Sequence, residues 1–394
     1  MTEFRTAQLT RLSLTGFRNY AALTLTLSAN MVALVGPNGA GKTNILEAIS
    51  FLTAGRGLRR AALADAARKD GDGSWSVAAT VLLDGMETRI GTGITAGAGG
   101  RKVRVDGVEV RGSENLLDYM RILWLVPAMD GLFTGPGSDR RRFLDRLTLA
   151  IDPSHGRRVG DFENALRQRN RLLDQGGSDA YLNALEQQVA ELGTAVSIAR
   201  AETVGLLSRM IANQAAEDLP FPHAAVALEG DFEAETAGLS AADREDHYRQ
   251  MLRDGRARDR AAGRTLNGPH LSDLKVLHAA KEMPAAQSST GEQKALLIGL
   301  ILAHAELTAK VSGMTPVLLL DEVAAHLDSN RRAALFVKLN SLGGQVFMTG
   351  TDEALFRGFA RCGAGVRDQG QRGTGNPGCP DPLNPPDSCG FFPR

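Results

Sequence analysis

The run Gly36-Pro37-Asn38-Gly39-Ala40-Gly41-Lys42-Thr43 has residue types and a spacing that could hold a nucleotide. It fits the phosphate-binding pattern in which a glycine and four further residues precede Gly-Lys-Ser/Thr. The glycines let backbone N–H groups turn toward phosphate oxygens. In this pattern Lys42 reaches the β- and γ-phosphates and the Thr43 hydroxyl holds Mg²⁺. We therefore predict a P-loop that binds ATP and Mg²⁺.

The segments on either side of this loop are those that a P-loop requires. Met31 to Val35 is a short apolar run, typical of a buried parallel strand. Asn44 to Leu52 has helical spacing, and the start of such a helix adds its positive dipole end to the phosphate site. A chance glycine-rich turn is the alternative, and this context argues against it.

An acidic pair ends a second apolar run. Val317 to Leu320 is followed by Asp321 and Glu322. Such pairs are common at helix N-termini, but downstream of a P-loop this one indicates the Walker B strand of an ABC-type ATPase. Asp321 is expected to share the Mg²⁺ site with Thr43, and Glu322 to orient or deprotonate the attacking water. The predicted catalytic residues are therefore Lys42, Asp321 and Glu322.

Ser289-Thr290-Gly291-Glu292 precedes a long apolar helix, expected from Ala295 to Leu307. Ser-x-Gly-Glu at a helix start resembles the ABC signature. The Ser289 hydroxyl, the Gly291 N–H and the helix dipole would form a second γ-phosphate cradle, with Glu292 beside them. In ABC-type heads this cradle faces the nucleotide of the opposite subunit, so that ATP joins two copies head to tail.

Two shorter motifs follow the Walker B strand. Ala324 to Asp328 is placed as a D-loop would be, although His326 could also be an ordinary surface histidine. Thr349-Gly350-Thr351-Asp352 stands where ABC heads usually have a switch histidine. Since no histidine is present there, a threonine would have to sense the γ-phosphate.

Composition sets limits on partners and location. The chain has 394 residues, with 45 basic and 45 acidic side chains, so its net charge predicts no partner, and any DNA-binding surface must be a local patch. All three cysteines lie at or after Cys362, which excludes a disulfide framework from the part before it and suits a reducing cytoplasm. The polar N-terminus does not read as a signal peptide, and we predict no membrane-spanning stretch.

Hydrophobic periodicity divides the chain into regions. Residues 1–150 are predicted to hold the P-loop and a β meander with turns at Asp84-Gly85 and Asp106-Gly107. Residues 151–262 are predicted to form a helical arm, broken once near Gln175 to Ser178. Residues 263–360 complete the ATPase head, and residues 361–394, rich in Gly and Pro, are predicted to be disordered.

Arginines gather in three places that could touch phosphate. They could also form solvated faces, and the sequence does not decide between these readings. The candidates for DNA contact are Arg59, Arg60, Arg140, Arg141 and the arm residues Arg157, Arg158, Arg167, Arg169 and Arg171.

The combination of motifs resembles the bacterial RecF family, an SMC/Rad50-like plan with a short arm. The resemblance covers Leu9 to Phe356. It rests on the following segments: Gly16 to Tyr20, Gly36 through Asn44, Leu46 to Ile49, Gly55-Arg56, Arg141 to Asp145, Gly268 to His270 with Asp273-Leu274, Asp321-Glu322 with Leu327-Asp328, and Thr349 to Asp352. It adds Asn44 to the expected cofactor-binding residues.

This resemblance implies an ATP-dependent DNA-binding protein of recombinational repair and replication maintenance. Such proteins form ATP-dependent homodimers, bind single-stranded and duplex DNA at gaps and junctions, and work with RecO and RecR to load RecA. Hydrolysis is slow in the family. The alternatives are another ABC-type ATPase of the SMC/Rad50 class, which would need a long coiled coil or a cysteine hook, and a transporter ATPase, which the long insertion argues against.

Two features depart from the family pattern. The family usually has an arginine after Gly-Pro-His, whereas Leu271 stands here. The tail from Arg361 onward does not resemble the family's end, which adds a last short strand.

Overall fold

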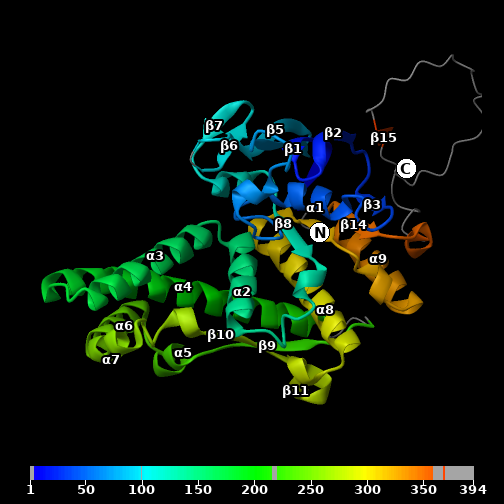
Figure 1. The fold of residues 1–394 in the computed structure, drawn as a ribbon. Coiled ribbons are helices and arrows are strands. Elements are labelled where there is room, and N and C mark those ends of the chain that lie inside the picture. The colour runs from blue at the N-terminus through cyan, green and yellow to red at the C-terminus, as the bar shows by residue number, and fades with distance from the viewer. Residues whose placement is uncertain (1–3, 99, 215–219, 358–366, 369–394) are drawn as a thin grey trace, which may run out of the picture. The chain divides into compact units, whose positions relative to one another are not determined.

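The computed structural model describes residues 4–98, 100–214, 220–357 and 367–368. Contacts divide the chain into two units (Figure 1). The first unit comprises Met1–Met129 and Thr308–Arg394, and the second comprises Asp130–Leu307. The predicted disordered tail, residues 361–394, lies outside the described residues except for Arg367–Asp368, which pair as strand β15 with β2 (Tyr20–Thr26).

A four-stranded parallel sheet forms the centre of the first unit. Its order is β3 (Met31–Val35), β14 (Val346–Gly350), β13 (Val317–Leu320) and β8 (Ile122–Leu125). The latter three are buried throughout, and β3 nearly so, which is why they read as continuous apolar runs. Because the strands are parallel, the segments that follow them meet at one edge of the sheet.

The predicted β meander is confirmed as part of an antiparallel sheet in the same unit. Asp84-Gly85 and Asp106-Gly107 have positive φ at both positions, the backbone of tight hairpin turns that match strand twist. The strands of this sheet are β1 (Arg5–Phe17), β2, β4 (Trp75–Leu83), β5 (Met86–Ile94), β6 (Lys102–Val105), β7 (Val108–Val110), β15 and, beside β1, β12 (Met314–Thr315).

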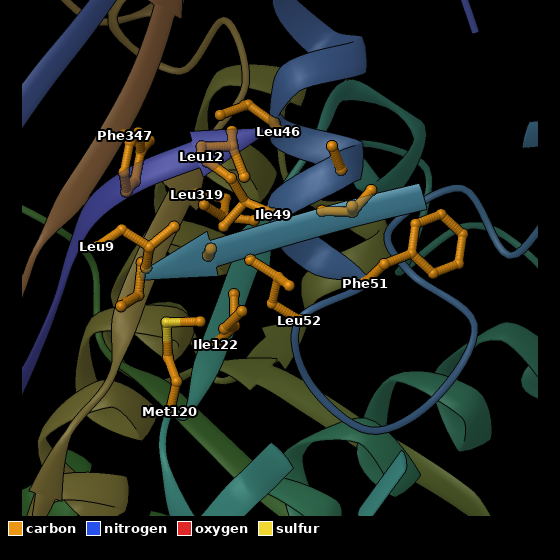
Figure 2. Packing of buried hydrophobic residues seen from close by; sticks show 14 of the residues in the cluster. Leu9, Leu12, Leu46, Ile49, Phe51, Leu52, Met120, Ile122, Leu319 and Phe347 are labelled. Atoms are coloured by element: carbon orange, nitrogen blue, oxygen red, sulfur yellow. The ribbon is translucent and has the colours of Figure 1, made fainter. Parts of the chain in front are cut away.

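The core of the first unit packs around the helix α1 (Lys42–Ser50). Figure 2 shows Leu46 and Ile49 of α1 among side chains from both sheets, including Leu12 of β1 and Phe347 of β14. These four residues are at most 1% exposed. Burying apolar side chains of this size stabilises the fold by roughly 1.5–3 kcal/mol each. Because a helix as short as α1 is not stable by itself in water, this packing is what maintains it.

The second unit contains the predicted helical region. α3 (His155–Asp174) and α4 (Asp179–Gln214) are joined at the predicted break and pack along each other through Phe162, Leu166 and Val189. The other helices up to the signature are α2 (Gly137–Ile151), α5 (Asp231–Glu235), α6 (Ala241–Asp254) and α7 (Arg256–Ala262). A small sheet of β9 (Ala224–Glu229), β10 (Asp273–His278) and β11 (Met283–Pro284) completes the unit.

A buried ion cluster ties α3 to α4 and α7. The Arg169 side chain is fully buried and donates to Glu186 Oε1 at 3.1 Å, Asp259 Oδ2 at 2.7 Å and the Leu252 carbonyl at 2.6 Å. The sequence-based suggestion that Arg169 contacts DNA is therefore wrong. The Arg169 charge is paired with Glu186 and Asp259 inside the unit, because the helical period places this residue on the inner face of α3.

Helix α8 (Thr290–Ser312) corrects one prediction about membranes. No membrane-spanning stretch was expected from the sequence. With 23 residues and a mean hydropathy of 1.5 in its most apolar window, this helix is long and apolar enough to cross a bilayer. Of its most apolar window, 72% is buried inside the protein. A helix that is hydrophobic on all sides and buried is typical of a protein core.

His304, within α8, is fully buried, and this burial lowers its pKa to about 3 from 6.5. The unfolded chain therefore binds more protons than the folded chain between these pH values, so stability falls as the pH drops below 6.5. Between pH 7 and pH 5 we expect a loss of about 2 kcal/mol from this group. Urea unfolding followed by circular dichroism checks this. A pH dependence unchanged in His304→Gln would contradict it.

Candidate nucleotide and metal site

The predicted P-loop connects the strand β3 to the helix α1, in the order strand, loop and helix that the sequence predicts. α1 begins at Lys42, and its N-cap is Gly41, at φ +94°, with no side chain capping the helix. A Cβ on Gly41 would lie 2.5 Å from the Tyr20 hydroxyl, so glycine is required there for space as well as for conformation. The uncapped N–H groups at the helix start are the donors that an anion needs.

Lys42 lies within this loop. Its Nζ donates to the carbonyl oxygens of Gly36 at 2.6 Å and Pro37 at 2.9 Å. The ammonium group is thus held over the loop, at the point where phosphates are expected.

Thr43 and Asp321 are brought together from positions 278 residues apart in the sequence. The Thr43 hydroxyl is 3.0 Å from both carboxylate oxygens of Asp321, which is 5% exposed. Hydroxyl and carboxylate oxygens are ligands that suit Mg²⁺. The donor set therefore fits the predicted metal.

Glu322 follows Asp321 in an unusual backbone conformation. Its φ is +55°, a region that non-glycine residues rarely adopt. Its side chain is partly exposed, whereas Asp321 is buried. Strained residues of this kind gather at active sites, where the surrounding structure holds them in place.

Thr349 joins this group, and sequence reasoning missed its role. Its hydroxyl lies 2.6 Å from Asp321 Oδ1 and 2.9 Å from the Glu322 nitrogen. Thr351, by contrast, is exposed. Of the two threonines in this motif, only Thr351 keeps a hydroxyl open to solvent.

A second unpredicted group supports α1 from the side. Glu47, 1% exposed, accepts two hydrogen bonds from Arg18 and one from Arg59. Asn44 donates to Asn19 Oδ1 at 2.7 Å and accepts from Arg59. Arg59, a candidate for DNA contact, thus pairs with a buried acid of the P-loop helix. The segment Gly16 to Tyr20, noted for its family resemblance, supplies the other partners.

Arg101 holds the far end of α1 and the loop after it. It donates to the carbonyl oxygens of Phe51, Thr53 and Gly55. Burial lowers the pKa of Arg101 to about 10. No local sequence pattern marks this residue, because the three carbonyl oxygens that it binds lie more than 40 positions away.

The signature residues lie in the second unit and form a capping box at the start of α8. Ser289 donates its N–H and its hydroxyl to the Glu292 carboxylate, and Glu292 donates its N–H to the Ser289 hydroxyl. Lys281 pairs with Glu292 at 2.5 Å, and this hydrogen bond, followed by those from Ser289, lowers the pKa of Glu292 to about 2. The Gly291 Cα has open space around it.

Two arginines of the basic cluster at the start of α2, Arg140 and Arg141, form hydrogen bonds within the second unit. Arg140 forms a two-pronged ion pair with Asp273 and donates to three carbonyls, which leaves its side chain 17% exposed. The hydrogen bonds that Arg140 donates to Asp273 also raise the pKa of Arg140. Arg141 donates to the Ser272 carbonyl. Arg140, a candidate for DNA contact, thus pairs with an acid of the same unit.

The Gly268 to His270 loop is fixed from the second unit's helices. Arg200 donates to the Pro269 carbonyl at 2.6 Å and pairs with Asp145. Although burial opposes it, hydrogen bonding from His155 and attraction by Arg200 lower the pKa of Asp145 to about 2. Leu271, where an arginine was expected, is 49% exposed.

The D-loop segment forms a short 3-10 turn over Ala324–His326. Asp328 then caps α9 (Ser329–Leu342) by accepting from the Arg331 N–H. His326 is exposed, as either reading of this residue would allow.

Known proteins share this sequence and this fold. The model of the family described as RecF/RecN/SMC N terminal domain matches residues 8–372. The "DNA replication and repair protein RecF" of Brucella suis biovar 1 (strain 1330) is 59% identical over 355 residues, which are 89% of this chain and 91% of the relative. The protein of the same name from Mesorhizobium japonicum is 57% identical over 351 residues, covering 88% and 92%.

Solved structures show the same architecture. The structure of "the recombination mediator protein RecF-ATPrS in RecFOR pathway" superposes with a TM-score of 0.80 at 23% identity, covering 90% of this chain and 95% of that one. An Smc head bound to a domain of ScpA gives a TM-score of 0.50 at 16% identity, over 89% and 91%. The predicted fold class, an α/β ABC-type ATPase head of the SMC kind, is confirmed. The chain belongs to the RecF family of DNA replication and repair proteins.

Proposed function

We propose that this protein is an ATP-dependent DNA-binding protein of recombinational repair and replication maintenance. The observation that carries the proposal is the cluster at one edge of the parallel sheet, where Thr43 and Asp321 lie 3.0 Å apart beside the uncapped start of α1. The relative cited above is described as a recombination mediator with bound ATPrS, and ATP binding is proposed here on the site's own geometry.

The P-loop residues Gly36 to Asn44 would hold the phosphates of ATP. Backbone N–H groups and Lys42 supply positive charge, and Thr43 with Asp321 would hold Mg²⁺. When bound, Mg-ATP supplies the γ-phosphoryl group and neutralises part of its charge. Glu322, partly exposed beside Asp321, would orient a water and accept its proton at a carboxylate oxygen.

Ser289 and Gly291 would face the nucleotide of a second copy, which makes the dimer depend on ATP. Glu292 is a carboxylate and would repel a phosphate, but its contacts suggest another role. It holds the Ser289 N–H and hydroxyl in place, and Lys281 balances its charge. We therefore assign Glu292 to the orientation of Ser289 rather than to direct contact with ATP.

DNA contact is assigned to arginines that the fold leaves on the surface. Arg157, Arg167 and Arg171 are exposed along α3, and the helical period places them within roughly a quarter turn of one another. Such side chains contact phosphates without reading sequence. Both single-stranded and duplex DNA are proposed ligands. RecO and RecR are proposed partners in loading RecA, in the cytoplasm, and membership of the RecF family supports this proposal.

DNA binding is tested by titrating labelled gapped DNA with protein at several salt concentrations, with and without Mg-ATP. We expect affinity to rise with ATP and to fall steeply with salt, because phosphate contacts release counterions. Arg167→Ala/Arg171→Ala should reduce the salt slope by about 2. Arg253→Ala, an exposed arginine on α6, serves as the control. Equal affinity with and without ATP would contradict ATP-gated binding.

A further inference from the structure

Thr349 lies at the end of β14, the strand between the P-loop strand β3 and the Walker B strand β13. Its side chain is completely buried. The hydroxyl donates to Asp321 Oδ1 at 2.6 Å and accepts from the Glu322 N–H at 2.9 Å. One hydroxyl therefore connects the side chain of one predicted catalytic residue to the backbone of the next.

This pattern differs from the usual fate of a buried threonine. Threonine hydroxyls commonly bond to backbone groups within a few residues of themselves, as Thr203 does with the Ala199 carbonyl. The partners of Thr349 are 28 and 27 residues away, on the neighbouring strand's end. Threonine is also stiff about χ1, so its hydroxyl is aimed in a reproducible direction.

The Glu322 backbone needs such support. A left-handed conformation at a non-glycine residue is unfavourable unless the surroundings maintain it. The hydrogen bond from the Glu322 N–H fixes the peptide that precedes its Cα. The direction in which the Glu322 side chain leaves the backbone is therefore set in part by Thr349.

We propose that Thr349 is a positioning residue for ATP hydrolysis, which holds the Glu322 peptide in its left-handed conformation and orients the Asp321 carboxylate toward Thr43. This inference rests on the proposed function, because it assigns Glu322 and Asp321 their roles in hydrolysis. Thr349 does not contact the nucleotide itself, since its hydroxyl is buried and both of its hydrogen bonds are made within the protein. It therefore acts through its neighbours.

The test compares three variants of the full chain. Thr349→Val keeps the branched shape and removes the hydroxyl, whereas Thr349→Ser keeps the hydroxyl. Thr26→Val, an exposed threonine at the end of β2 in the same unit, is the matched control. For each we would measure the rate of phosphate release at saturating Mg-ATP, the Kd for a fluorescent ATP analogue, and hydrogen exchange of the Glu322 amide by mass spectrometry.

We expect Thr349→Val to lower the hydrolysis rate about 10- to 100-fold, because a small misplacement of a catalytic group has an effect of this size. Its Kd for nucleotide should stay close to that of the wild type, and Glu322 exchange should accelerate. Thr349→Ser should restore both the rate and the protection, and Thr26→Val should change neither.

Full activity in Thr349→Val, no rescue by Thr349→Ser, or a raised Kd with an unchanged rate would each overturn the proposal. Tryptophan fluorescence distinguishes a misfolded variant from a folded but inactive one, because Trp75 and Trp124 both lie in the first unit, which contains Thr349. If the wild type neither binds nor hydrolyses ATP, the proposed function fails. The exchange measurement still decides, without nucleotide, whether Thr349 holds the Glu322 amide, and unchanged exchange in Thr349→Val would sink the idea.

Discussion

Replacing Glu322 by glutamine should lower the rate of ATP hydrolysis by about 10²- to 10³-fold, the usual contribution of a positioned general base. Glutamine keeps the side chain's size and leaves the backbone N–H that bonds to Thr349. ATP binding should therefore persist, and the ATP-bound dimer should accumulate. Phosphate release and sedimentation velocity with and without Mg-ATP measure both effects. Hydrolysis at the wild-type rate would exclude Glu322 as the base.

A second substitution tests whether the ATP-bound dimer forms because Ser289 and Gly291 of one copy contact the nucleotide of the other. Ser289→Asp keeps a residue that can cap a helix, but its charge opposes a phosphate. In the Glu322→Gln background it should return the protein to a monomer with Mg-ATP. Thr290→Ala, exposed and adjacent, should leave the dimer intact. A dimer that survives Ser289→Asp would mean that the signature does not face the partner's nucleotide.

Replacing Arg169 by methionine should destabilise the second unit by about 3–5 kcal/mol, because it leaves the buried Asp259 carboxylate without its ion-pair partner and leaves Glu186 paired with Arg256 alone. Glu186 is fully buried and Asp259 is 5% exposed, and both accept from Arg169. Methionine preserves much of the volume, so that the lost charge dominates the effect. Urea unfolding followed by circular dichroism at a helical wavelength would measure the change.

Arg167→Met provides the comparison for this prediction. Arg167 lies two residues earlier on α3, and its side chain is 63% exposed in a surface pair with Glu163. Its replacement should change stability by less than about 0.5 kcal/mol. Tryptophan fluorescence, which reports the first unit, should respond little to either substitution. Equal effects of the two methionine variants would show that the buried cluster contributes no special stability.

The motifs of the candidate site were predictable because each is local. The P-loop, the acidic pair and the signature all lie on short runs whose neighbours already show a strand or a helix. Parallel strands bring their carboxyl ends to one edge, so the meeting of Thr43 with Asp321 could be expected from the strand type alone. Family membership followed from the same runs.

The fate of the arginines was not predictable in this way. Arg140, Arg157 and Arg169 look alike in sequence, yet one pairs with Asp273, one is exposed and one is fully buried. The residues next to an arginine do not indicate its ion-pair partner when that partner is 17 to 133 residues away. Only the packing of helices and strands against one another selects which arginines remain exposed as candidates for the proposed DNA contact.

The amino-acid order alone was sufficient for the ATPase class, the strands and helices around the P-loop, and the break in the helical region, since these depend on spacing within a few turns. The tertiary structure decided that Thr349 links Asp321 to Glu322 and that Glu292 caps its own helix. It also showed Glu47 binding two arginines. Hydrogen bonds require atoms to lie within about 3 Å, and folding alone brings most of these groups so close.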